Sequence, residues 1–571
     1  MRNKTSDTLR FPFVSAFLST TAFYLVYLII LRPGYYIIDD PKMIQIVSGY
    51  PAAPPAPFMV FSNVLLGLGL QFLYKTFSGP NWEILLFVAV NFLSIWGINY
   101  TLLSSRTTTA YQKLAGILAA TGCSAYFQLQ LTFTFTAAFT IIAGTCLIWS
   151  AAHPSSSHRK LILFWGIALI VAGSIIRIDA LAIILPLFAA MVALNLPSLV
   201  KNRYITSGLL ITGGLIAACT IFEQAYLHLS PGWNSFYTYT AARSSLHDTH
   251  RLQNLHGQIK AIGWSKNDQE LFARWFYFDK QTYSLKNLEY LTKHTSATSH
   301  FGRALVNTFL EHVLSWLMLP YILITTALGL FVISTTSSIK TLLTLIIMMS
   351  IALMENLYLA WAMKDPDRVL LSSLAGVAIF GIVLVDWPQK LIALDFHKVS
   401  IRSVCLYIAV VCASTSIGMF AYQSGNATNR HIEEQQGYKQ ILMDLNELQA
   451  TGKLASNAVM ISTSHGLPLE WADPFALDFP AIPYLDTGWI TFSPVYEQTL
   501  EKYDIKSLPD ALYQRNNLYI FTDSNFTGFL HQYYQEHENI NVIFHPIYAI
   551  ANVYRFPGYE NIQLYKITKA K

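Results

Sequence analysis

Two adjacent carboxylates, Asp39 and Asp40, follow the first long apolar run of the chain, in the segment GYYIIDDPKMIQIVSGYP. A carboxylate at the edge of a membrane can accept a proton from an attacking hydroxyl group. It can also hold a divalent cation against a phosphate. Neighbouring side chains on an extended segment point to opposite sides, so we expect one aspartate to face a substrate and the other to hold the loop. The alternative is structural, with Asp40 as the N-cap of a helix over PKMIQIVSG and Pro41 at its first position.

Four further charges are predicted at the same membrane boundary. Arg177 and Asp179 flank a short turn between two apolar runs, where a structural ion pair is favoured. Glu355 and Arg368 lie at the ends of two later runs. Charge beside hydrocarbon is costly, so these residues are candidates for function. Together they predict a polar cavity that faces outward.

Two basic residues complete the set of predicted substrate contacts. Arg243, in YTYTAARSSLHDTH, carries a guanidinium fork that matches phosphate oxygens, and a surface ion pair is its alternative role. Lys42 lies two positions after Asp40.

The composition indicates a polytopic membrane protein. Of 571 residues, 53% are hydrophobic and 12% are charged, with a mean hydropathy of +0.38. A soluble globular protein carries about 25% charged residues. No basic stripe with interleaved aromatic residues suggests a nucleic-acid partner. The five cysteines have no metal-binding spacing, which argues against a disulfide framework or a structural zinc.

Basic connectors between the apolar runs predict the orientation, because cytoplasmic loops carry the excess of Lys and Arg. Arg2, Lys4 and Arg10 place the N-terminus in the cytoplasm. The remaining cytoplasmic connectors carry Arg106/Lys113, Arg159/Lys160, Lys201/Arg203, Lys340 and Lys390/Lys398/Arg402. Eleven spans are predicted, near residues 11–31, 82–104, 113–129, 131–151, 161–177, 180–196, 205–229, 304–334, 340–354, 369–386 and 403–422. The C-terminus then lies outside.

One further run, FMVFSNVLLGLGLQFLYKTF at 58–77, is apolar enough to span. Counting it as a span would move two basic connectors to the outer side. We therefore predict an interfacial or re-entrant helix, which needs protein cover for its backbone. An ordinary span that breaks the charge rule is the alternative.

The fold class predicted is mainly α, a polytopic helix bundle with a C-terminal extracytoplasmic α/β domain. Residues 1–425 form the membrane module, with outer loops at 32–81 and 230–303, and residues 426–571 form the α/β domain. In the second loop, SKNDQELFARWFY and SLKNLEYLTK have helix caps. The tail starts with an amphipathic helix in RHIEEQQGYKQILMDLNELQATGKL, and the short runs NAVMIST, NLYIFTD, NVIFHPIYAI and IQLYKI predict strands. Its Trp471 and Trp489 either stack on sugar rings or dock the domain onto the membrane part.

An apolar helix that leads into an outer loop with an acidic pair resembles the GT-C superfamily of membrane glycosyltransferases. These include oligosaccharyltransferases, protein mannosyltransferases and lipid A aminoarabinose transferases. The resemblance implies interfacial helices and a catalytic aspartate in the first outer loop. YFQLQLTFTFTAAF, at 126–139, stands where the family often has a second acid, and it contains none. Metal dependence is therefore open: no cofactor is predicted outright, and Mg²⁺ or Mn²⁺ is the alternative.

The chain is also similar to a group of bacterial multipass proteins over YIIDDPKMIQIVSG, GWSKNDQELFARWFYFDKQTYSL and STSHGLPLEWADPFALDFP. Carried over, Asp39 or Asp40 is the general base and Arg243 or Arg368 a phosphate ligand. The reaction implied is sugar transfer from a polyprenyl-phosphate donor to a cell-envelope glycan or lipid, at the outer face of the bacterial inner membrane. Two other functions stay open. A flippase or transporter of lipid-linked glycan predicts internal repeats, and we find none that is convincing. A non-catalytic envelope-assembly protein would not need the aspartates for chemistry.

Overall fold

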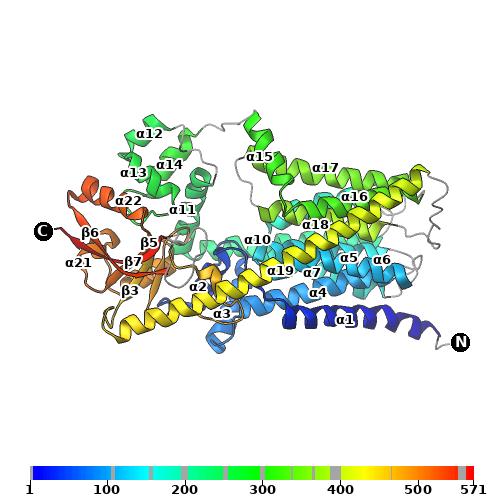
Figure 1. Ribbon diagram of the computed structural model, residues 1–571, viewed down its shortest axis with the longest axis horizontal. Helices are drawn as coiled ribbons and strands as arrows, with labels where there is room; N and C mark the ends of the chain where they lie inside the picture. The colour runs from blue at the N-terminus through cyan, green and yellow to red at the C-terminus, as the bar shows by residue number, and fades with distance from the viewer. Residues whose placement is uncertain are drawn as a thin grey trace.

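Long apolar helices fill one end of the molecule, and a five-stranded sheet with short helices lies at the other (Figure 1). The computed structural model describes residues 4–104, 110–152, 158–194, 203–248, 252, 255–295, 303–335, 338–362, 367–385, 400–463, 466–550 and 561–570. Arg2, Arg106, Lys201, Lys390 and Lys398 of the predicted connectors lie outside these ranges, as do the ends of the predicted spans 180–196 and 369–386.

Eleven helices correspond to the predicted spans. They are α1 (Lys4–Ile30), α4 (Trp82–Ser104), α5 (Ala110–Leu129), α6 (Phe133–Ala152), α7 (Arg159–Ile176), α8 (Asp179–Ala193), α10 (Arg203–His228), α16 (Leu319–Ser334), α17 (Ile339–Trp361), α18 (Asp367–Leu384) and α19 (Ile401–Ala450). Among the described residues, eight helices are long and apolar enough to cross a membrane, namely α1, α4, α6, α7, α10, α17, α18 and α19. These helices suggest a membrane-embedded protein. Helices α8 and α16, with 15 and 16 residues, are short for a hydrocarbon core of about 30 Å.

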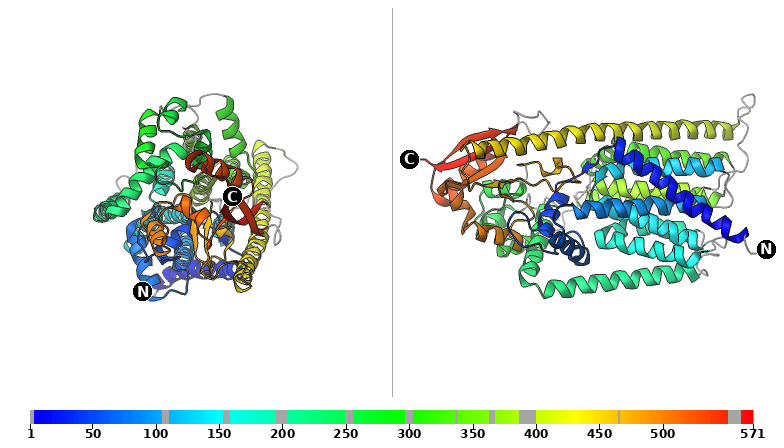
Figure 2. Two further views of the ribbon diagram at one scale, coloured as in Figure 1. Left: turned by 90° about the vertical axis from the view of Figure 1, so that its left-hand side faces the viewer. Right: turned by 90° about the horizontal axis from the view of Figure 1, so that it is seen from below.

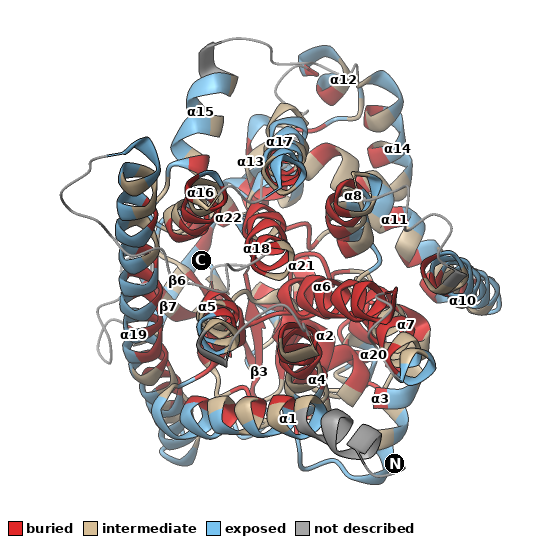
Figure 3. Cartoon of the chain, turned by 90° about the vertical axis from the view of Figure 1, so that its right-hand side faces the viewer, coloured by how far each residue is buried: buried red, intermediate tan, exposed pale blue. Residues whose placement is uncertain are grey.

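Helices α6 and α18 lie at the centre of the bundle, and α1, α10 and α19 lie around it (Figure 3). The apolar 18-residue stretch of α6 is completely buried, whereas only 17% of the corresponding stretch of α10 is buried. The surrounding helices expose large apolar side chains such as Leu210 and Ile401. Apolar side chains on an outer surface fit a hydrocarbon environment.

The predicted span 304–334 is wrong, because two helices occupy it. Helix α15 (Arg303–Val313) ends before a turn, and α16 begins at Leu319. Pro320 lies in the first turn of α16. A proline in the interior of one long helix would remove a backbone donor and clash with the preceding turn, so the chain restarts there.

Helix α19 is a single helix of 50 residues that runs from the bundle to the sheet (Figure 2). The sequence predicted a span at 403–422 and a separate amphipathic helix, with a domain boundary after residue 425. No proline interrupts residues 401–450, so the helix continues through that boundary. The two parts of the molecule are therefore joined by continuous helix.

The C-terminal sheet has the strand order β4-β3-β5-β7-β6. Its strands are β3 (Val459–Ser462), β4 (Tyr484–Asp486), β5 (Leu518–Asp523), β6 (Val542–Ala549) and β7 (Ile562–Lys569). Strands β4 and β5 pair with β3 in parallel, and β7 pairs with β5 and β6 antiparallel. The helices and helical turns of this part are η2 (Leu469–Trp471), α20 (Pro494–Lys502), α21 (Leu508–Gln514), α22 (Phe526–Tyr533) and η3 (Tyr534–Glu538). The four predicted strands are confirmed, and β4 was not predicted.

The outer loop 230–303 packs on this sheet and shares a core with it. Its helices are α11 (Pro231–His247), α12 (His256–Ala261), α13 (Lys266–Ala273) and α14 (Leu285–His294). Leu271 and Tyr277 belong to the same buried cluster as Ile520 and Leu530. Ser265 and Ser284 cap α13 and α14 as predicted. Loop and tail thus form one folded unit, which we call the sheet unit.

The first outer loop contains β1 (Gly34–Tyr35), α2 (Asp39–Ser48) and α3 (Val64–Thr76). Strand β1 pairs in parallel with β2 (Gln130–Leu131), which lies between α5 and α6. Helix α3 has 13 residues, which is about 20 Å and too short to span. This length fits the interfacial prediction for 58–77 and disfavours an ordinary span.

Candidate functional site

The segment that leads into α2 is fixed between two parts of the bundle. Gly34 and Tyr35 pair with Gln130 and Leu131. From the other side, His431 of α19 bonds through Nδ1 to the carbonyl oxygen of Arg32, at 2.8 Å. A Cβ on Gly34 would lie 2.5 Å from the His431 ring, so only glycine fits there. This close packing determines where α2 begins.

Asp40 caps a helix other than its own. The N-cap of α2 is Ile38, which makes no side-chain cap bond. Asp40 Oδ1 instead accepts a hydrogen bond of 2.9 Å from the backbone N–H of Phe133, the first residue of α6. A carboxyl group at a helix N-terminus satisfies a donor that the helix leaves free. The prediction that Asp40 caps the helix over PKMIQIVSG is therefore wrong, because Asp40 caps α6 instead. The extended conformation predicted for the two aspartates is also wrong, because both lie in the first turn of α2.

Asp40 is completely buried, and its Oδ2 has no hydrogen-bond partner among the described residues. Burial raises the pKa of Asp40 to about 8, and the Phe133 hydrogen bond only partly opposes this. Burial thus favours the protonated form of the side chain. Its enclosure and its bond to Phe133 disfavour Asp40 as a general base and favour a structural role.

Asp39 has a different environment, with 18% of its side chain exposed. Trp489 donates a hydrogen bond from Nε1 to Asp39 Oδ1, at 3.0 Å. Arg368 Nη2, in the first turn of α18, lies 3.7 Å from Asp39 Oδ2. The carboxylate is thus oriented on one side by an indole and lies beside a guanidinium group on the other.

A second guanidinium group, that of Arg177, lies in the same neighbourhood. Arg177 Nη1 donates to Thr134 Oγ1 at 2.7 Å, and Nη2 lies 3.5 Å from Asp179 Oδ2. The charges of Arg368 and of Asp39 both act on Arg177. Arg368 Nε is buried and has no hydrogen-bond partner among the described residues. Two neighbouring guanidinium groups with an unused donor are a favourable place for an anion such as phosphate.

Three aromatic rings form a cluster that reaches Asp39 through the hydrogen bond of Trp489. Phe61 stacks on Phe133 with 5.6 Å between ring centroids, and it meets Trp489 edge-on at 5.0 Å. The Phe133 ring also lies 4.8 Å from the Arg177 guanidinium. Flat apolar rings beside polar groups are the surfaces on which sugar rings pack. The site therefore combines a carboxylate, two cations and an aromatic wall.

Phe61 lies two residues before Asn63, the N-cap of α3. The Asn63 side chain accepts from the N–H of Leu65, and its Nδ2 donates to Glu223 of α10, at 3.0 Å. Val60, the residue before Phe61, has a φ of 70°. A β-branched residue rarely adopts this left-handed conformation, which stores strain next to the site.

Trp489 is positioned by an ion pair between α2 and the sheet. Lys42 Nζ lies 2.6 Å from Asp486 Oδ2 and donates to the carbonyl oxygen of Thr487 at 3.2 Å. The two side chains are 2% and 1% exposed. Burial raises the pKa of Asp486 to about 6, and Lys42 opposes the shift. Lys42 was predicted to contact substrate, but its ammonium group is enclosed and serves to hold the loop that carries Trp489.

Arg243 and Glu355 are not brought to Asp39. Arg243 is 2% exposed, donates to the Tyr277 hydroxyl at 3.1 Å and lies 4.8 Å from the Trp275 ring. This burial disfavours its predicted role as a phosphate ligand. Both carboxylate oxygens of Glu355 are buried and lack a hydrogen-bond partner among the described residues. Of the four boundary charges, Arg177, Asp179 and Arg368 converge on Asp39.

Trp489 was predicted either to stack on sugar rings or to dock the C-terminal domain, and its hydrogen bond to Asp39, 450 positions away, fits the docking alternative. Trp471, its predicted counterpart, is 1% exposed in the core of the sheet unit. One residue of interest, Glu83, was missed from the sequence. Glu83, at the start of α4, is completely buried with both oxygens unpartnered among the described residues. Its signal was a lone acid in NWEILLF at the start of an apolar run.

Glu83 and Asp40 are neighbours of the same tyrosine. Burial, Glu83, Tyr74 and Asp40 raise the pKa of Tyr35, whose hydroxyl accepts a hydrogen bond from Asn81 Nδ2 at 2.9 Å. Buried carboxyl groups without basic partners are expected to be neutral. This acidic neighbourhood is distinct from the partly exposed Asp39.

Within the described parts of the chain, one group of three side chains could hold a metal ion, namely Asp268, Glu536 and His537. Asp268 Oδ2 already accepts from the backbone N–H of Ser265, and Oδ1 bonds to His537 at 3.0 Å. The group lies in the sheet unit and contains neither Asp39 nor Asp40. A divalent cation at Asp39 stays a prediction.

No model of a known protein family matches the chain, and no curated protein matches it. The geometry around Asp39 is therefore the main guide to function.

Proposed function

We propose that the protein is a glycosyltransferase that moves a sugar from a polyprenyl-phosphate donor to a cell-envelope glycan or lipid. The observation that carries this proposal is the partly exposed Asp39 carboxylate beside the guanidinium groups of Arg368 and Arg177. A carboxylate is suited to accept a proton, and guanidinium groups are suited to bind a phosphate. The apolar helices of the bundle support a lipid-linked substrate.

The proposed site faces the outside of a bacterial inner membrane. Basic connectors support a cytoplasmic N-terminus, with Asp39 and the sheet unit on the outer side. An acceptor in the cell envelope would then reach Asp39 from the outer side. The lipid-linked donor would reach it from the bilayer.

In the proposed reaction, Asp39 accepts the proton of an acceptor hydroxyl while that oxygen attacks the anomeric carbon. The bond between this carbon and the phosphate oxygen breaks, and polyprenyl phosphate leaves with the bonding electron pair. Arg368 and Arg177 offset the charge that develops on the leaving phosphate. The indole of Trp489 holds Oδ1, so Oδ2 is the oxygen that faces the substrate. A single displacement inverts the anomeric carbon.

The test is sugar transfer in proteoliposomes, with radiolabelled polyprenyl-phosphate hexoses and crude envelope acceptor. Asp39→Asn removes the general base, and we expect a loss of roughly 10²–10⁴-fold in rate. Asp40→Asn keeps an oxygen for the Phe133 N–H and should retain most of the activity. Arg368→Gln should weaken donor binding.

Asp40→Asn is the matched control, because it makes the same chemical change at the adjacent position. Equal activity of wild type and folded Asp39→Asn would contradict the proposal. So would a loss confined to Asp40→Asn. Absence of transfer from the wild type over a full panel of donors would favour a transporter or an assembly protein.

A further inference from the structure

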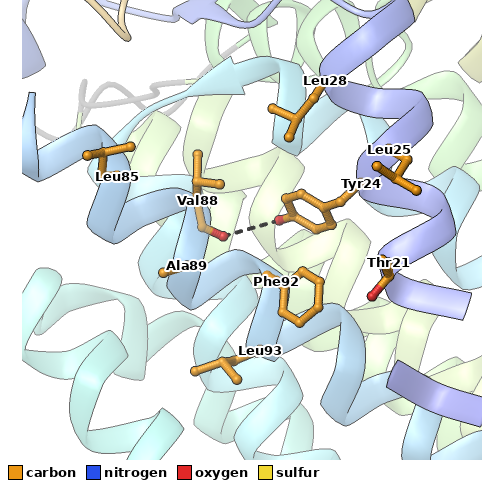
Figure 4. A pocket seen from close by; sticks show the side chains of 9 residues that line it. All are labelled: Thr21, Tyr24, Leu25, Leu28, Leu85, Val88, Ala89, Phe92 and Leu93. Carbon is orange, nitrogen blue, oxygen red and sulfur yellow. Dashed lines mark hydrogen bonds between the residues drawn. The ribbon is translucent and has the colours of Figure 1, made fainter. Parts of the chain in front are cut away.

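An apolar groove of about 600 Å³ lies between α1 and α4 (Figure 4). Its lining residues are Thr21, Tyr24, Leu25 and Leu28 of α1, and Leu85, Val88, Ala89, Phe92 and Leu93 of α4. Ligand sites for small molecules have volumes of about 300–1,000 Å³, so the groove is large enough for a substantial ligand. It has no part in the contacts around Asp39.

The groove faces the outside of the bundle. Leu25, Leu28 and Leu85 are 56%, 50% and 42% exposed. The Tyr24 hydroxyl donates to Gln128 Oε1 at 2.8 Å and lies 3.5 Å from the Val88 carbonyl oxygen (Figure 4), so protein groups already satisfy this polar atom. Both helices are candidate membrane spans, so this surface meets hydrocarbon. A groove with apolar walls in such surroundings is suited to a hydrocarbon chain.

The groove lies in the half of each helix that adjoins the first outer loop. Its α1 residues come shortly before the end of that helix at Ile30, and α2 begins at Asp39. Its α4 residues follow Glu83, which is a neighbour of Tyr35 in that loop. An apolar groove and a pair of arginines at one end of the bundle fit a lipid with a phosphate head group. We infer that the groove binds the hydrocarbon chain of the polyprenyl-phosphate substrate, an inference that rests on the proposed function.

Photolabelling tests this assignment without any transfer assay. The full chain is placed in phosphatidylglycerol nanodiscs with a polyprenyl phosphate that carries a diazirine on its chain, and labelled peptides are mapped after irradiation. We expect label on the peptides that contain residues 21–28 and 85–93. Excess unlabelled polyprenyl phosphate should suppress this label, whereas excess phosphatidylglycerol should not.

Ala89 provides a variant that fills the groove without disturbing the core, because it lines the groove and is exposed. Ala89→Trp should reduce the specific label about tenfold, which corresponds to about 1.4 kcal/mol, and Ala89→Leu should reduce it less. Leu210→Trp, at a side chain of α10 that is 71% exposed, is the control and should leave the label unchanged. Melting temperatures close to that of the wild type verify that the variants fold.

Suppression of the label by phosphatidylglycerol as well would overturn the inference, because the groove would then hold bulk lipid. Label outside the groove, or label unaffected by Ala89→Trp, would overturn it too. Sugar transfer with no label in the groove would support the proposed function and contradict binding of the polyprenyl chain in the groove. Specific label without sugar transfer would support binding of the polyprenyl chain in the groove and contradict the proposed glycosyltransferase activity.

Discussion

At the scale of single residues, two adjacent aspartates have opposite environments. Asp39 is 18% exposed and lies beside a cation, whereas Asp40 is completely buried and bonds to a backbone N–H. Successive residues on a helix are rotated by about 100°, so the first turn of α2 can present one carboxyl group to the site and the other to the core. The structure therefore separates the two roles that the sequence left undivided.

The buried Asp40 predicts a pH-dependent stability. Folded Asp40 keeps its proton up to about pH 8, while the unfolded residue loses it near the ordinary value of 3.8. Between these values the folded state binds the extra proton, so stability falls as the pH rises, by up to about 1.4 kcal/mol per pH unit. Asp40→Asn should flatten this dependence, because the amide carries no charge and still accepts from Phe133. Thermal unfolding in detergent from pH 5 to 9 measures the difference.

Asp179→Asn is the control for that experiment, since the Asp179 side chain is 72% exposed. It should keep the pH dependence of the wild type. An Asp40→Asn variant with an unchanged slope would show that folded Asp40 does not take up this proton.

Sequence reasoning could predict the charged members of the site but not their partners. Asp39, Arg177, Asp179 and Arg368 were identified because charge is unusual beside apolar runs. Lys42 and Arg243 were misjudged, since nothing local reveals that Asp486 and Tyr277 enclose them. Burial of these charged side chains depends on contacts from 34 to more than 400 positions away, and no periodicity encodes such contacts.

At the scale of elements, α3 shows how closely the first outer loop is packed. A Cβ on Gly67 would lie 1.8 Å from the backbone carbonyl oxygen of Pro57, whereas a Cβ on Gly69 would meet nothing within 4 Å. The two glycines are in the same helix of 13 residues. They form a matched pair in which only the space beside the helix differs.

Alanine at these two positions should have opposite effects. Gly69→Ala should stabilise the protein by up to about 1 kcal/mol, because alanine has the higher helix propensity. Gly67→Ala should push α3 away from Pro57 and destabilise the protein by about 1–3 kcal/mol or more. Melting temperatures of the two variants in the same detergent measure this contrast. Equal melting temperatures would contradict the contact between Gly67 and Pro57.

Most elements could be predicted from hydropathy, charge and caps. The bundle helices follow apolar runs, and the serine caps of α13 and α14 mark their starts. Strand β4 could not be predicted, since Tyr484–Asp486 is three residues long and owes its conformation to pairing with β3. The continuity of α19 was missed because a change from apolar to polar composition resembles a boundary. The composition of a segment reflects whether its surroundings are apolar or aqueous. A helix, by contrast, can continue from one to the other as long as no residue such as proline breaks it.

At the scale of the whole molecule, the bundle and the sheet unit meet at the proposed site. Helix α19 connects them covalently, and Trp489 reaches from the sheet unit to Asp39. The buried pair of Lys42 and Asp486 joins the same two parts. The sheet unit therefore contributes a residue to the site and is more than a cover for it.

The pair of Lys42 and Asp486 predicts strong energetic coupling between the two parts. Removing one partner leaves an uncompensated buried charge, so Lys42→Met or Asp486→Asn should each cost about 3–5 kcal/mol if the other group stays charged. The double variant, with two neutral side chains, should cost clearly less than the sum of the single variants. Unfolding free energies from SDS titration give the four corners of the cycle.

The exposed pair of Lys280 and Glu497 supplies the control cycle, because it is an ion pair of similar length, 2.9 Å, that lies within the sheet unit. With side chains 71% and 41% exposed, it should show little coupling. Substitutions at Lys42 or Asp486 should also affect the site, because these two residues hold the loop that carries Trp489. Trp489 fluorescence, isolated by subtracting a Trp489→Phe variant, should therefore change in Lys42→Met and remain unchanged in Lys280→Met. Strict additivity at Lys42 and Asp486 would mean that the membrane bundle and the sheet unit are stable independently of this contact.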